Sequence, residues 1–400
     1  MDKASVKDID VRGKRALVRV DFNVPIDEKT GAIMDDSRIR ASLPTIKYLI
    51  EKGAKVVLAS HLGRPDGKVV ESMRMAPVAK RLSELLGKEV TTTRDCVGPD
   101  VEKASLDLKD GGILLLENLR FHAEEESNNP DFAQALAKVA DIYVDDAFGT
   151  AHRKHASMVG VTKYLPSVAG LLMERELKVL GSLLDNPAHP FCALLGGAKI
   201  SDKVSLVRSI MGKIDRVLIG GGMAATFLKG KGLETGQSLV EEDRVETASQ
   251  IMRDAESANV RLLLPVDVLV ADKIGLDAST QVVSAERVPS NMRIVDLGPK
   301  AIKAFQEQLK GCKTVFWNGP MGIYEVPLFA AGTKAMATTL ASLNASTVIG
   351  GGSTADIVAE LGLENRMSFV STGGGASLSF LSGEKLPGVE ALMNKPVKRP

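Results

Sequence analysis

Arginine residues recur shortly after apolar runs in the first half of the chain. Arg64, Arg120 and Arg153 each follow such a run, and Arg38 adds a fourth cation. A guanidinium group binds a carboxylate or a phosphate through two parallel hydrogen bonds, so several of them together indicate a site for a small polyanion. A single arginine is more often a solvated surface residue, and a single histidine is more often structural. His61, in the loop that holds Arg64, is a candidate for a further anion donor.

Glycine follows five apolar runs in the second half of the chain. The glycine loops lie at 196–197, 220–222, 319–322, 350–352 and 373–375. Because glycine has no side chain, the backbone N–H groups of such loops can approach phosphate oxygens, and the helix that follows adds its positive end. Tight packing of helix on strand explains a single glycine turn. Five in succession favour a nucleotide site.

Known nucleotide motifs fit these loops poorly. Residues 220–225 and 350–355 match G-x-G-x-x-A, which a nicotinamide dehydrogenase normally carries once, after its first strand. The late and repeated occurrence argues against a nicotinamide oxidoreductase, which remains the alternative class of enzyme. No segment matches G-x-x-x-x-G-K-[ST], so the pattern also excludes a Walker-type NTPase.

Two lysines follow the first glycine loop. Lys199 and Lys203 are spaced as one helical turn, so both could face the oxygens of an anionic ligand. The alternative is that they are ordinary solvent-exposed lysines.

Short runs rich in leucine and β-branched residues alternate with segments of helical spacing. The runs predict strands at 16–20, 55–59, 113–116, 142–144, 191–195, 217–219, 260–264, 314–317, 347–349 and 368–370. Continuous apolar strands that alternate with helices are typical of parallel sheets covered on both faces. We therefore predict an α/β fold of two doubly wound, Rossmann-like parallel sheets, with ligands at the carboxyl ends of the strands.

The predicted domain boundary is a long helical segment, 171–184, which ends in the turn signal Asp185-Asn186-Pro187. It predicts a first domain over residues 1–170, an interdomain helix and hinge over 171–186, and a second domain over 187–386. A chain of 400 residues is too long for one ordinary core, which agrees with two domains.

Composition narrows the class further. Hydrophobic residues make up 44% and charged residues 25%, as in soluble globular proteins, and a net charge of +1 favours neither nucleic acid nor a membrane as partner. The polar N-terminus and the lack of a long apolar run argue against a signal peptide or a membrane span. Cys96, Cys192 and Cys312 are scattered without metal-site spacing. We expect reduced thiols in a cytoplasmic monomer.

Six longer motifs occur in a fixed order: RVDFNVP (19–25), SHLGRP (60–65), LENLRF (116–121), GGAKISDK (196–203), WNGP (317–320) and STGGG (371–375). In this order they resemble the phosphoglycerate kinase family, and the resemblance extends over essentially the whole chain. It implies reversible phosphoryl transfer from 1,3-bisphosphoglycerate to MgADP, which gives 3-phosphoglycerate and MgATP. It also implies that the C-terminal tail, from about 387 to 400, returns to the first domain.

The resemblance assigns candidate residues to each ligand. Those implied for phosphoglycerate are Asp21, Phe22, Asn23, Arg38, His61, Leu62, Gly63, Arg64, Arg120 and Arg153. Those implied for the nucleotide are Lys203, Glu325, Gly351, Gly352, Ser353 and Thr354. Arg38, Lys199 and the backbone at Gly374 are the implied catalytic groups, with Mg²⁺ as the cofactor.

The chemistry of this reaction agrees with the residues present. The acceptor is a carboxylate that is already ionised at pH 7, so no general base is required. In-line positioning and neutralisation of the moving charge are required instead. The resemblance also implies a hinge closure that brings the two ligands together and excludes water.

Three positions depart from the family pattern. Ser353 stands where the family commonly has an aspartate that helps to hold Mg²⁺, and a neutral hydroxyl is a poorer ligand for a hard cation. Asp356 is another carboxylate that could take its place. Ile294 and Ser379 replace a frequent glycine and a usual glutamate. An inactive binding relative therefore remains an alternative to an active kinase.

Overall fold

The computed structural model describes residues 2–27 and 29–395. Its contacts divide the chain into two units, which we describe separately. Unit 1 contains the residues up to Lys178 together with those from Lys385 onward, and unit 2 contains Val179–Glu384. Within the described ranges, no helix is both long and apolar enough to cross a membrane.

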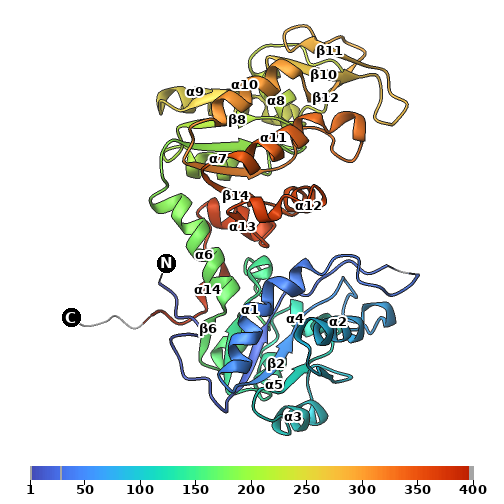
Figure 1. Cartoon of the computed structure of the whole chain (residues 1–400), viewed down its shortest axis with the longest axis vertical. Coiled ribbons are helices and arrows are strands. Elements are labelled where there is room, and N and C mark those ends of the chain that lie inside the picture. The colour runs from blue at the N-terminus through green and yellow to red at the C-terminus, as the bar shows by residue number, and fades with distance from the viewer. Residues whose placement is uncertain (1, 28, 396–400) are drawn as a thin grey trace, which may run out of the picture. The chain divides into compact units, whose positions relative to one another are not determined.

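Unit 1 is built on a six-stranded sheet in the order β3-β4-β2-β1-β5-β6. Figure 1 labels two of its strands, β2 and β6. The strands are β1 (Arg15–Arg19), β2 (Lys55–Ala59), β3 (Thr91–Thr92), β4 (Ile113–Leu115), β5 (Ile142–Asp145) and β6 (Ser167–Ala169). All pairings are parallel, and nearly every residue of β1, β2, β4 and β5 is buried. A parallel sheet buried on both faces is what continuous apolar runs predict.

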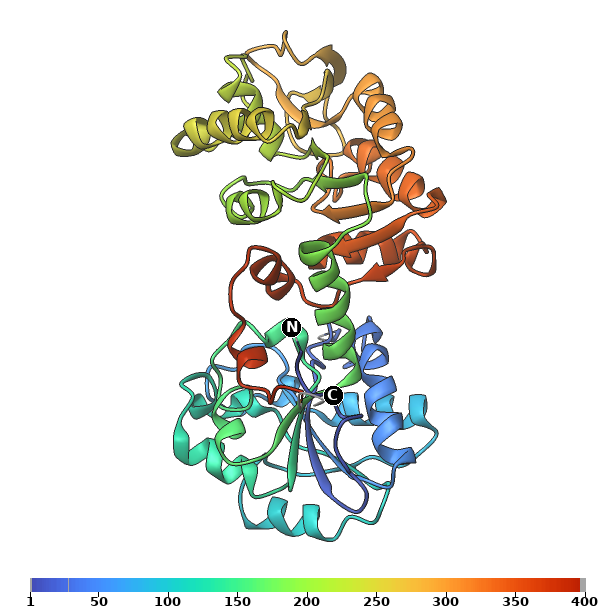
Figure 2. The ribbon, with the colours of Figure 1, turned by 90° about the vertical axis from the view of Figure 1, so that its left-hand side faces the viewer.

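Helices pack around this sheet (Figure 2). They are α1 (Ser37–Glu51), α2 (Ala76–Leu86), α3 (Pro99–Leu106), α4 (Ala123–Glu126), α5 (Pro130–Ala137) and α14 (Pro387–Glu390). Local sequence fixes several of their ends. Gly87 ends α2 with φ 61°, and the Asn129 side chain caps α5 by accepting from two backbone N–H groups.

The helix α6 (Leu171–Asp185) agrees with the predicted helical segment, and the division between the units falls within it. Its first turn is capped by Asp146, whose Oδ1 accepts from Leu172 N at 2.9 Å. Burial raises the pKa of Asp146 to about 7. Asp146 thus fixes the start of α6 on the strand end of β5.

Both ends of the described chain belong to unit 1. Ala4 N donates to Met393 O at 2.9 Å, and Lys3 forms an antiparallel bridge with Asn394. Gly388 N donates to Ala151 O at 2.9 Å. The C-terminal tail is expected to return to the first domain, and these contacts place it there as far as residue 395. Residues 396–400 lie outside the described ranges.

Unit 2 has a second six-stranded parallel sheet, in the order β15-β14-β13-β7-β8-β9. Its strands are β7 (Phe191–Leu195), β8 (Arg216–Ile219), β9 (Arg261–Leu263), β13 (Thr314–Asn318), β14 (Ser346–Gly350) and β15 (Phe369–Val370). Its helices are α7 (Val204–Ile210), α8 (Met223–Gly230), α9 (Val245–Ser257), α10 (Pro299–Leu309), α11 (Ala331–Ser342), α12 (Gly352–Glu360) and α13 (Gly375–Leu381). Trp317 is fully buried in the core of this unit.

A small antiparallel sheet in unit 2 was not predicted from the sequence. It consists of β10 (Asp267–Ala271), β11 (Thr280–Ser284) and β12 (Arg293–Leu297), in the order β11-β10-β12. Most of β11 is exposed, and the strand carries polar residues that gave no apolar run. Val268, Val270, Val288 and Met292 form its own small core.

Candidate functional site

The strand register brings the predicted anion-binding loops of unit 1 to one edge of the sheet. Arg19 pairs with Ala59 of β2 on one side and with Asp145 of β5 on the other. The loops that follow β1, β2, β4 and β5 therefore emerge at the same carboxyl edge, as the doubly wound fold requires.

Hydrogen bonds join three of these loops. Asn23 Oδ1 accepts from Gly63 N at 2.8 Å, and Arg120 Nη1 donates to Gly63 O at 2.9 Å. Asn118 Nδ2 donates to Leu62 O at 2.7 Å. The predicted residues Asn23, Gly63 and Arg120 are thus brought into direct contact.

Arg38 joins the same group from the start of α1. Its Nη1 donates to Asp21 Oδ2 at 2.7 Å, while its side chain stays 40% exposed. The contact orients the guanidinium group and leaves donors free for a ligand. Phe22 and Leu62 lie differently, because their side chains are buried in the core of unit 1. They can offer a ligand only their backbone.

The electrostatics of His61 show how closely the cations gather. Burial lowers the pKa of His61 well below its ordinary value, and the charges of Arg19, Arg120, Arg153 and Arg38 lower it further. A neutral imidazole thus lies among four guanidinium groups. Arg19 Nη2 lies 3.2 Å from His61 Nδ1. Because arginine only donates, Nδ1 accepts and the ring proton is on Nε2, where it can be donated.

Arg19 is a member of this cluster that the sequence reasoning missed. It is only 1% exposed, and it donates to Ser157 Oγ at 3.0 Å and to Val20 O. Ser157 Oγ in turn donates to the buried Glu125 at 2.6 Å. The available signal was a charged residue inside an otherwise apolar strand.

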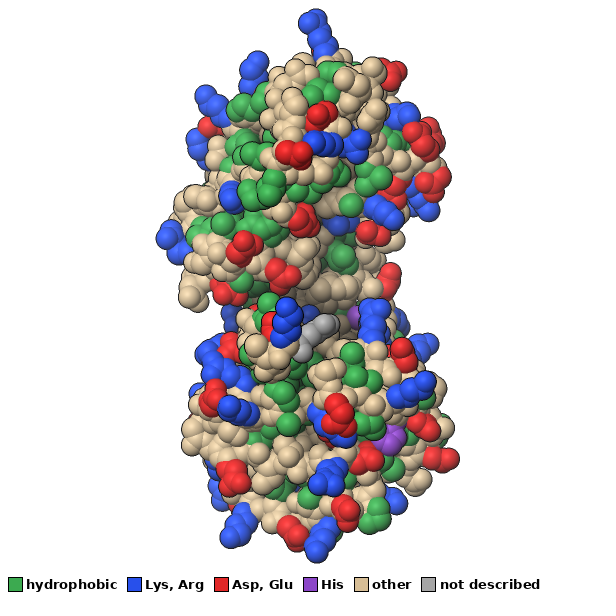
Figure 3. Space-filling view, turned by 90° about the vertical axis from the view of Figure 1, so that its right-hand side faces the viewer, with side chains coloured by type: hydrophobic (Ala, Val, Ile, Leu, Met, Phe, Trp, Pro, Cys, Tyr) green, Lys and Arg blue, Asp and Glu red, His purple; other side chains and the backbone are tan. Residues whose placement is uncertain are grey.

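The two remaining predicted cations, Arg153 and Arg64, are less buried than Arg120. Arg153 is half-buried and close enough to lower the pKa of His61. Arg64 is exposed on the loop after β2. Over the face that Figure 3 presents, cationic and anionic side chains are interspersed. The arginine cluster is therefore a local concentration of charge on a chain whose net charge is +1.

In unit 2, packing alone explains several of the glycines that predicted a nucleotide site. A Cβ added at Gly196 would lie 2.1 Å from Pro320 O, and one added at Gly319 would lie 2.4 Å from Gly196 O. Gly221 would meet Gly197 N at 2.6 Å. These glycines let the loops after β7, β8 and β13 pack against one another, so the five loops are not equal candidates for phosphate contact.

Two other glycine loops have open space where a side chain would stand. No atom lies within 4 Å of a Cβ added at Gly352, Gly374 or Gly375. Gly374 has φ 51°, which an L side chain rarely adopts, and directly precedes α13. The backbone at the starts of α12 and α13 is therefore accessible to a ligand.

A cavity of about 570 Å³ lies beside the glycine loops of unit 2. It is lined by Gly197, Gly222, Ile294, Pro320, Glu325 and neighbouring apolar residues. Glu325, a predicted nucleotide residue, and Ile294, which replaces a frequent glycine of the family, therefore line the same cavity. Arg293 also lines it, and its buried Nε has no hydrogen-bond partner. Sequence reasoning missed Arg293.

The predicted helical placement of Lys199 and Lys203 is wrong. The helix α7 begins at Val204, so both lysines lie in the turn that precedes it. Lys203 is only 7% exposed. Its Nζ lies close to Gly197, 3.3 Å from the position that a Cβ atom would take on that glycine. Burial lowers the pKa of Lys203, and the nearby charge of Asp202 opposes that shift. Lys199 is exposed.

The start of α12 carries the residues that the family resemblance implies for Mg²⁺. Ser353 and Asp356 are exposed in its first turns, while Thr354 is buried and its Oγ1 accepts from Gly319 N at 2.7 Å. Thr354 therefore holds the loops together. Exposed oxygens at Ser353 and Asp356 fit a Mg²⁺ ion that keeps most of its ligands on phosphate and water.

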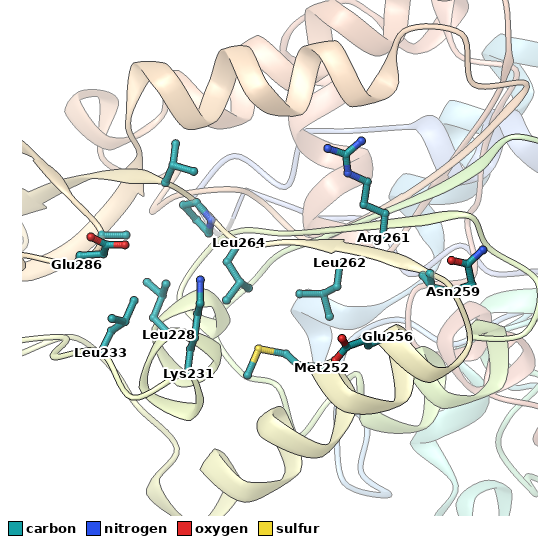
Figure 4. A pocket seen from close by; sticks show the side chains of 14 residues that line it. Leu228, Lys231, Leu233, Met252, Glu256, Asn259, Arg261, Leu262, Leu264 and Glu286 are labelled. Atoms are coloured by element: carbon teal, nitrogen blue, oxygen red, sulfur yellow. The ribbon is translucent and has the colours of Figure 1, made fainter.

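A larger cavity, of about 640 Å³, lies elsewhere in unit 2 (Figure 4). It is lined by Leu228 of α8, Met252 and Glu256 of α9 and Leu262 of the edge strand β9, together with Lys231. None of its lining residues belongs to a glycine loop. Size alone therefore does not locate the candidate nucleotide site.

The environment of His155 in unit 1 makes stability depend on pH. Burial, followed by the charges of Arg19 and Arg120, lowers the pKa of His155 from 6.5 to about 4. Between these values the unfolded chain binds a proton that the folded chain does not, so this residue causes the free energy of unfolding to fall as pH falls from about 6.5 to 4. The variant His155→Gln should show a smaller loss between pH 7.5 and pH 5 in urea unfolding. An equal loss in both proteins would contradict this account.

An arginine cluster in unit 1 and a glycine-lined cavity in unit 2, each at the carboxyl edge of a parallel sheet, are features expected of a phosphotransferase. Comparison with known proteins places the chain in the kinase class of phosphotransferases. The family model for phosphoglycerate kinase matches residues 6–384. The chain therefore belongs to the phosphoglycerate kinase family, and its activity is that of a phosphoglycerate kinase.

Individual relatives agree with this assignment. The chain is 54% identical over 393 residues to the phosphoglycerate kinase of Microcystis aeruginosa, covering 97% of this chain and 98% of that one. It is 54% identical over 400 residues to a chloroplastic phosphoglycerate kinase of Volvox carteri, covering 98% and 87%. The solved structure of the Coxiella burnetii enzyme superposes with a TM-score of 0.87 at 39% identity, covering 97% of this chain and 98% of that one.

Proposed function

We propose that the phosphoryl group moves between the β-phosphate of an adenine nucleotide and the carboxylate of 3-phosphoglycerate. The observation that carries this proposal is the crowding of four arginines around a neutral His61 in unit 1. Burial also lowers the pKa of Arg120, and its Nε lies 3.1 Å from Glu126 Oε1. A small ligand with phosphate and carboxylate groups supplies the anions that such a cluster lacks.

The roles of the unit 1 residues follow from their contacts. Asp21 orients Arg38, Asn23 fixes the backbone at Gly63, and Arg120 lies on the same turn. These groups bind and orient phosphoglycerate, and His61 donates from Nε2. Arg64 and Arg153 add charge at the rim. Phe22 and Leu62 contribute through the backbone.

The nucleotide is assigned to unit 2. The cavity beside Glu325 and Gly222 accommodates the nucleoside, and the buried Lys203 offers a cation against Gly197. Gly351, Gly352 and Ser353 place backbone N–H groups at the start of α12, where the helix end favours phosphate. Lys199 and the backbone at Gly374 neutralise charge on the group in transfer.

Mg²⁺ enters with the nucleotide in this proposal. The metal neutralises phosphate charge, and Ser353 and Asp356 are the residues placed to hold it or its water ligands. The protein itself binds, orients and excludes water. We also propose a cytoplasmic monomer, in keeping with the free thiols of Cys96, Cys192 and Cys312.

A coupled assay with 3-phosphoglycerate and MgATP tests this function. Turnover that depends on both substrates is expected. Binding of MgADP and 3-phosphoglycerate without turnover at millimolar Mg²⁺ or Mn²⁺ would instead identify an inactive relative. NADH should not compete with MgADP, and competition would favour the oxidoreductase alternative.

The variant Ser353→Asp should require less Mg²⁺ for half-maximal activity. An added carboxylate at the exposed start of α12 is a stronger ligand for a hard cation than a hydroxyl. We expect the required concentration to fall by about tenfold, the effect of about 1.4 kcal/mol. Thr338→Asp, on the exposed face of α11, adds the same charge elsewhere in unit 2 and should leave the Mg²⁺ dependence unchanged. Equal shifts in both variants would show a general charge effect.

A further inference from the structure

Three side chains of unit 1 that play no part in the proposed reaction form a compact group. One ligand atom from each of Asp95, Cys96 and His122 lies within 4.8 Å of the other two. Among residues 2–27 and 29–395, this is the one group of three or more histidine, cysteine or acidic side chains that meets this criterion. The spacing of the cysteines in the sequence gave no sign of it.

The fold holds this group in place from two separate segments. Asp95 and Cys96 follow the edge strand β3, while His122 lies between the short 3-10 turn η2 (Leu119–Phe121) and α4. Thr93 Oγ1 donates to Asp95 O at 2.7 Å, and Cys96 N donates to Asp95 Oδ1 at 2.6 Å. The carboxylate is therefore oriented by its own loop.

His122 is fixed against that carboxylate. Its Nε2 lies 2.7 Å from Asp95 Oδ1, and its ring packs on Phe132 with the centroids 5.2 Å apart. The Cys96 side chain is fully buried, whereas the side chains of Asp95 and His122 are 52% and 29% exposed. The group therefore has a thiol on its inner side and is open to solvent on the other.

We propose that Asp95, Cys96 and His122 bind a thiophilic divalent cation, Zn²⁺, with water as the fourth ligand. Zinc takes sulfur, nitrogen and oxygen ligands at about 2.0–2.3 Å in tetrahedral sites. Ligands at these distances lie within about 4 Å of one another, and the three atoms already lie within 4.8 Å, so only a small contraction closes the site. A thiolate and an imidazole do not suit Mg²⁺ or Ca²⁺, which take oxygen ligands.

Binding replaces a proton by the metal. The thiol Cys96–SH loses its proton to solvent and the sulfur–zinc bond forms. His122 Nε2, which donates to Asp95, gives up its proton to solvent, and the neutral ring keeps or takes up a proton on Nδ1. The hydrogen bond between His122 and Asp95 is thus replaced by two bonds to the same ion. No electron is transferred. The bound metal links the loop after β3 to the segment that carries Arg120, two residues before His122. It should therefore restrict that segment and stabilise unit 1.

Cobalt titration of the full-length protein tests the site, because Co²⁺ substitutes for Zn²⁺ and reports a thiolate ligand by a near-ultraviolet charge-transfer band. One equivalent should give this band together with tetrahedral d–d absorption, and Zn²⁺ should displace both. His122→Gln and Asp95→Asn should each weaken Co²⁺ binding by at least about tenfold. Cys96→Ser should abolish the charge-transfer band.

Two matched controls exist in unit 2. His189 Nδ1 lies 2.7 Å from Asp215 Oδ2, which makes a similar histidine–aspartate pair without the cluster's cysteine. His189→Gln and Cys312→Ser should keep the wild-type cobalt spectrum. Stoichiometric Zn²⁺ should also raise the Tm of the wild-type protein but not that of His122→Gln.

The proposal fails if the wild-type protein gives no cobalt–thiolate band, or if His122→Gln and Asp95→Asn bind Co²⁺ as tightly as the wild type. Cys96 is fully buried, so a Cys96→Ser variant that does not fold is set aside. The partly exposed His122 and Asp95 then decide the question through their binding constants and the effect of Zn²⁺ on Tm.

Discussion

Replacing Arg38 by alanine should lower kcat by about 100- to 1000-fold, the effect of removing one oriented donor from a developing charge. Arg38 is fixed by its 2.7 Å contact with Asp21 and is still 40% exposed, so its remaining donors are accessible to the ligand that we propose. Arg38→Lys should recover only part of the loss, because an ammonium group lacks the planar fork. Steady-state kinetics with both substrates varied measure the effect.

Arg40 provides the matched control for Arg38. It lies on the same helix, α1, and is exposed, with Nε 2.7 Å from Asp36 Oδ1. Arg40→Ala should leave kcat within about twofold of the wild type, since exposed ion pairs contribute little. A similar loss of kcat in both variants would mean that the helix, and not the Arg38 side chain, had been disturbed.

The variant Lys199→Ala should lower kcat much more than it raises either KM. Lys199 is exposed in the turn before α7, beside the glycine loop after β7, and contributes to the lowered pKa of Glu241. A cation that meets the phosphoryl group only during transfer stabilises the transition state more than the bound substrates. We expect a loss in kcat of about 100-fold, measured in the coupled assay in both directions.

Lys229→Ala separates this effect from a general loss of positive charge in unit 2. Lys229 is an exposed lysine of α8 whose Nζ lies 2.6 Å from Glu242 Oε1. The control should retain wild-type kinetics. An unchanged kcat for Lys199→Ala would remove Lys199 from the mechanism, and a rise in the nucleotide KM alone would make it a binding residue.

Most strands of the two parallel sheets could be predicted from the sequence, because they are apolar runs buried in the sheet. The exposed two-residue strand β3 and the short strand β6 were not predicted. The runs 55–59 and 191–195 match β2 and β7 residue for residue, because every position of β7 and every position of β2 after Lys55 is buried and apolar. The strand β11 of the antiparallel sheet could not be predicted in this way. Its residues 280–284 face solvent, so no apolar run marks them.

Part of the candidate site also required the fold. Asp21, Asn23, Arg38 and Arg120 could be nominated because their motifs resemble those of a known family. Arg19 looked like a strand residue, and only the packing shows it buried against His61. Similarly, the spacing of Lys199 and Lys203 fits a helix, but the helix begins one residue later, at Val204.

The two ends of unit 1 meet only after the whole of unit 2 has been made. A ribosome adds about 5–20 residues per second, so roughly 10–40 s separate Lys178 from Lys385 during synthesis. Throughout that interval Ala151 O and Ser167 O lack the partners that Gly388 N and Met393 N later supply. Unit 2 is one contiguous stretch of chain, whereas unit 1 needs residues from both ends of the sequence. Synthesis of unit 2 is therefore finished before that of unit 1, although unit 1 is started first. Unit 1 therefore leaves the ribosome as a nascent domain that still lacks the hydrogen bonds made by its C-terminal segment.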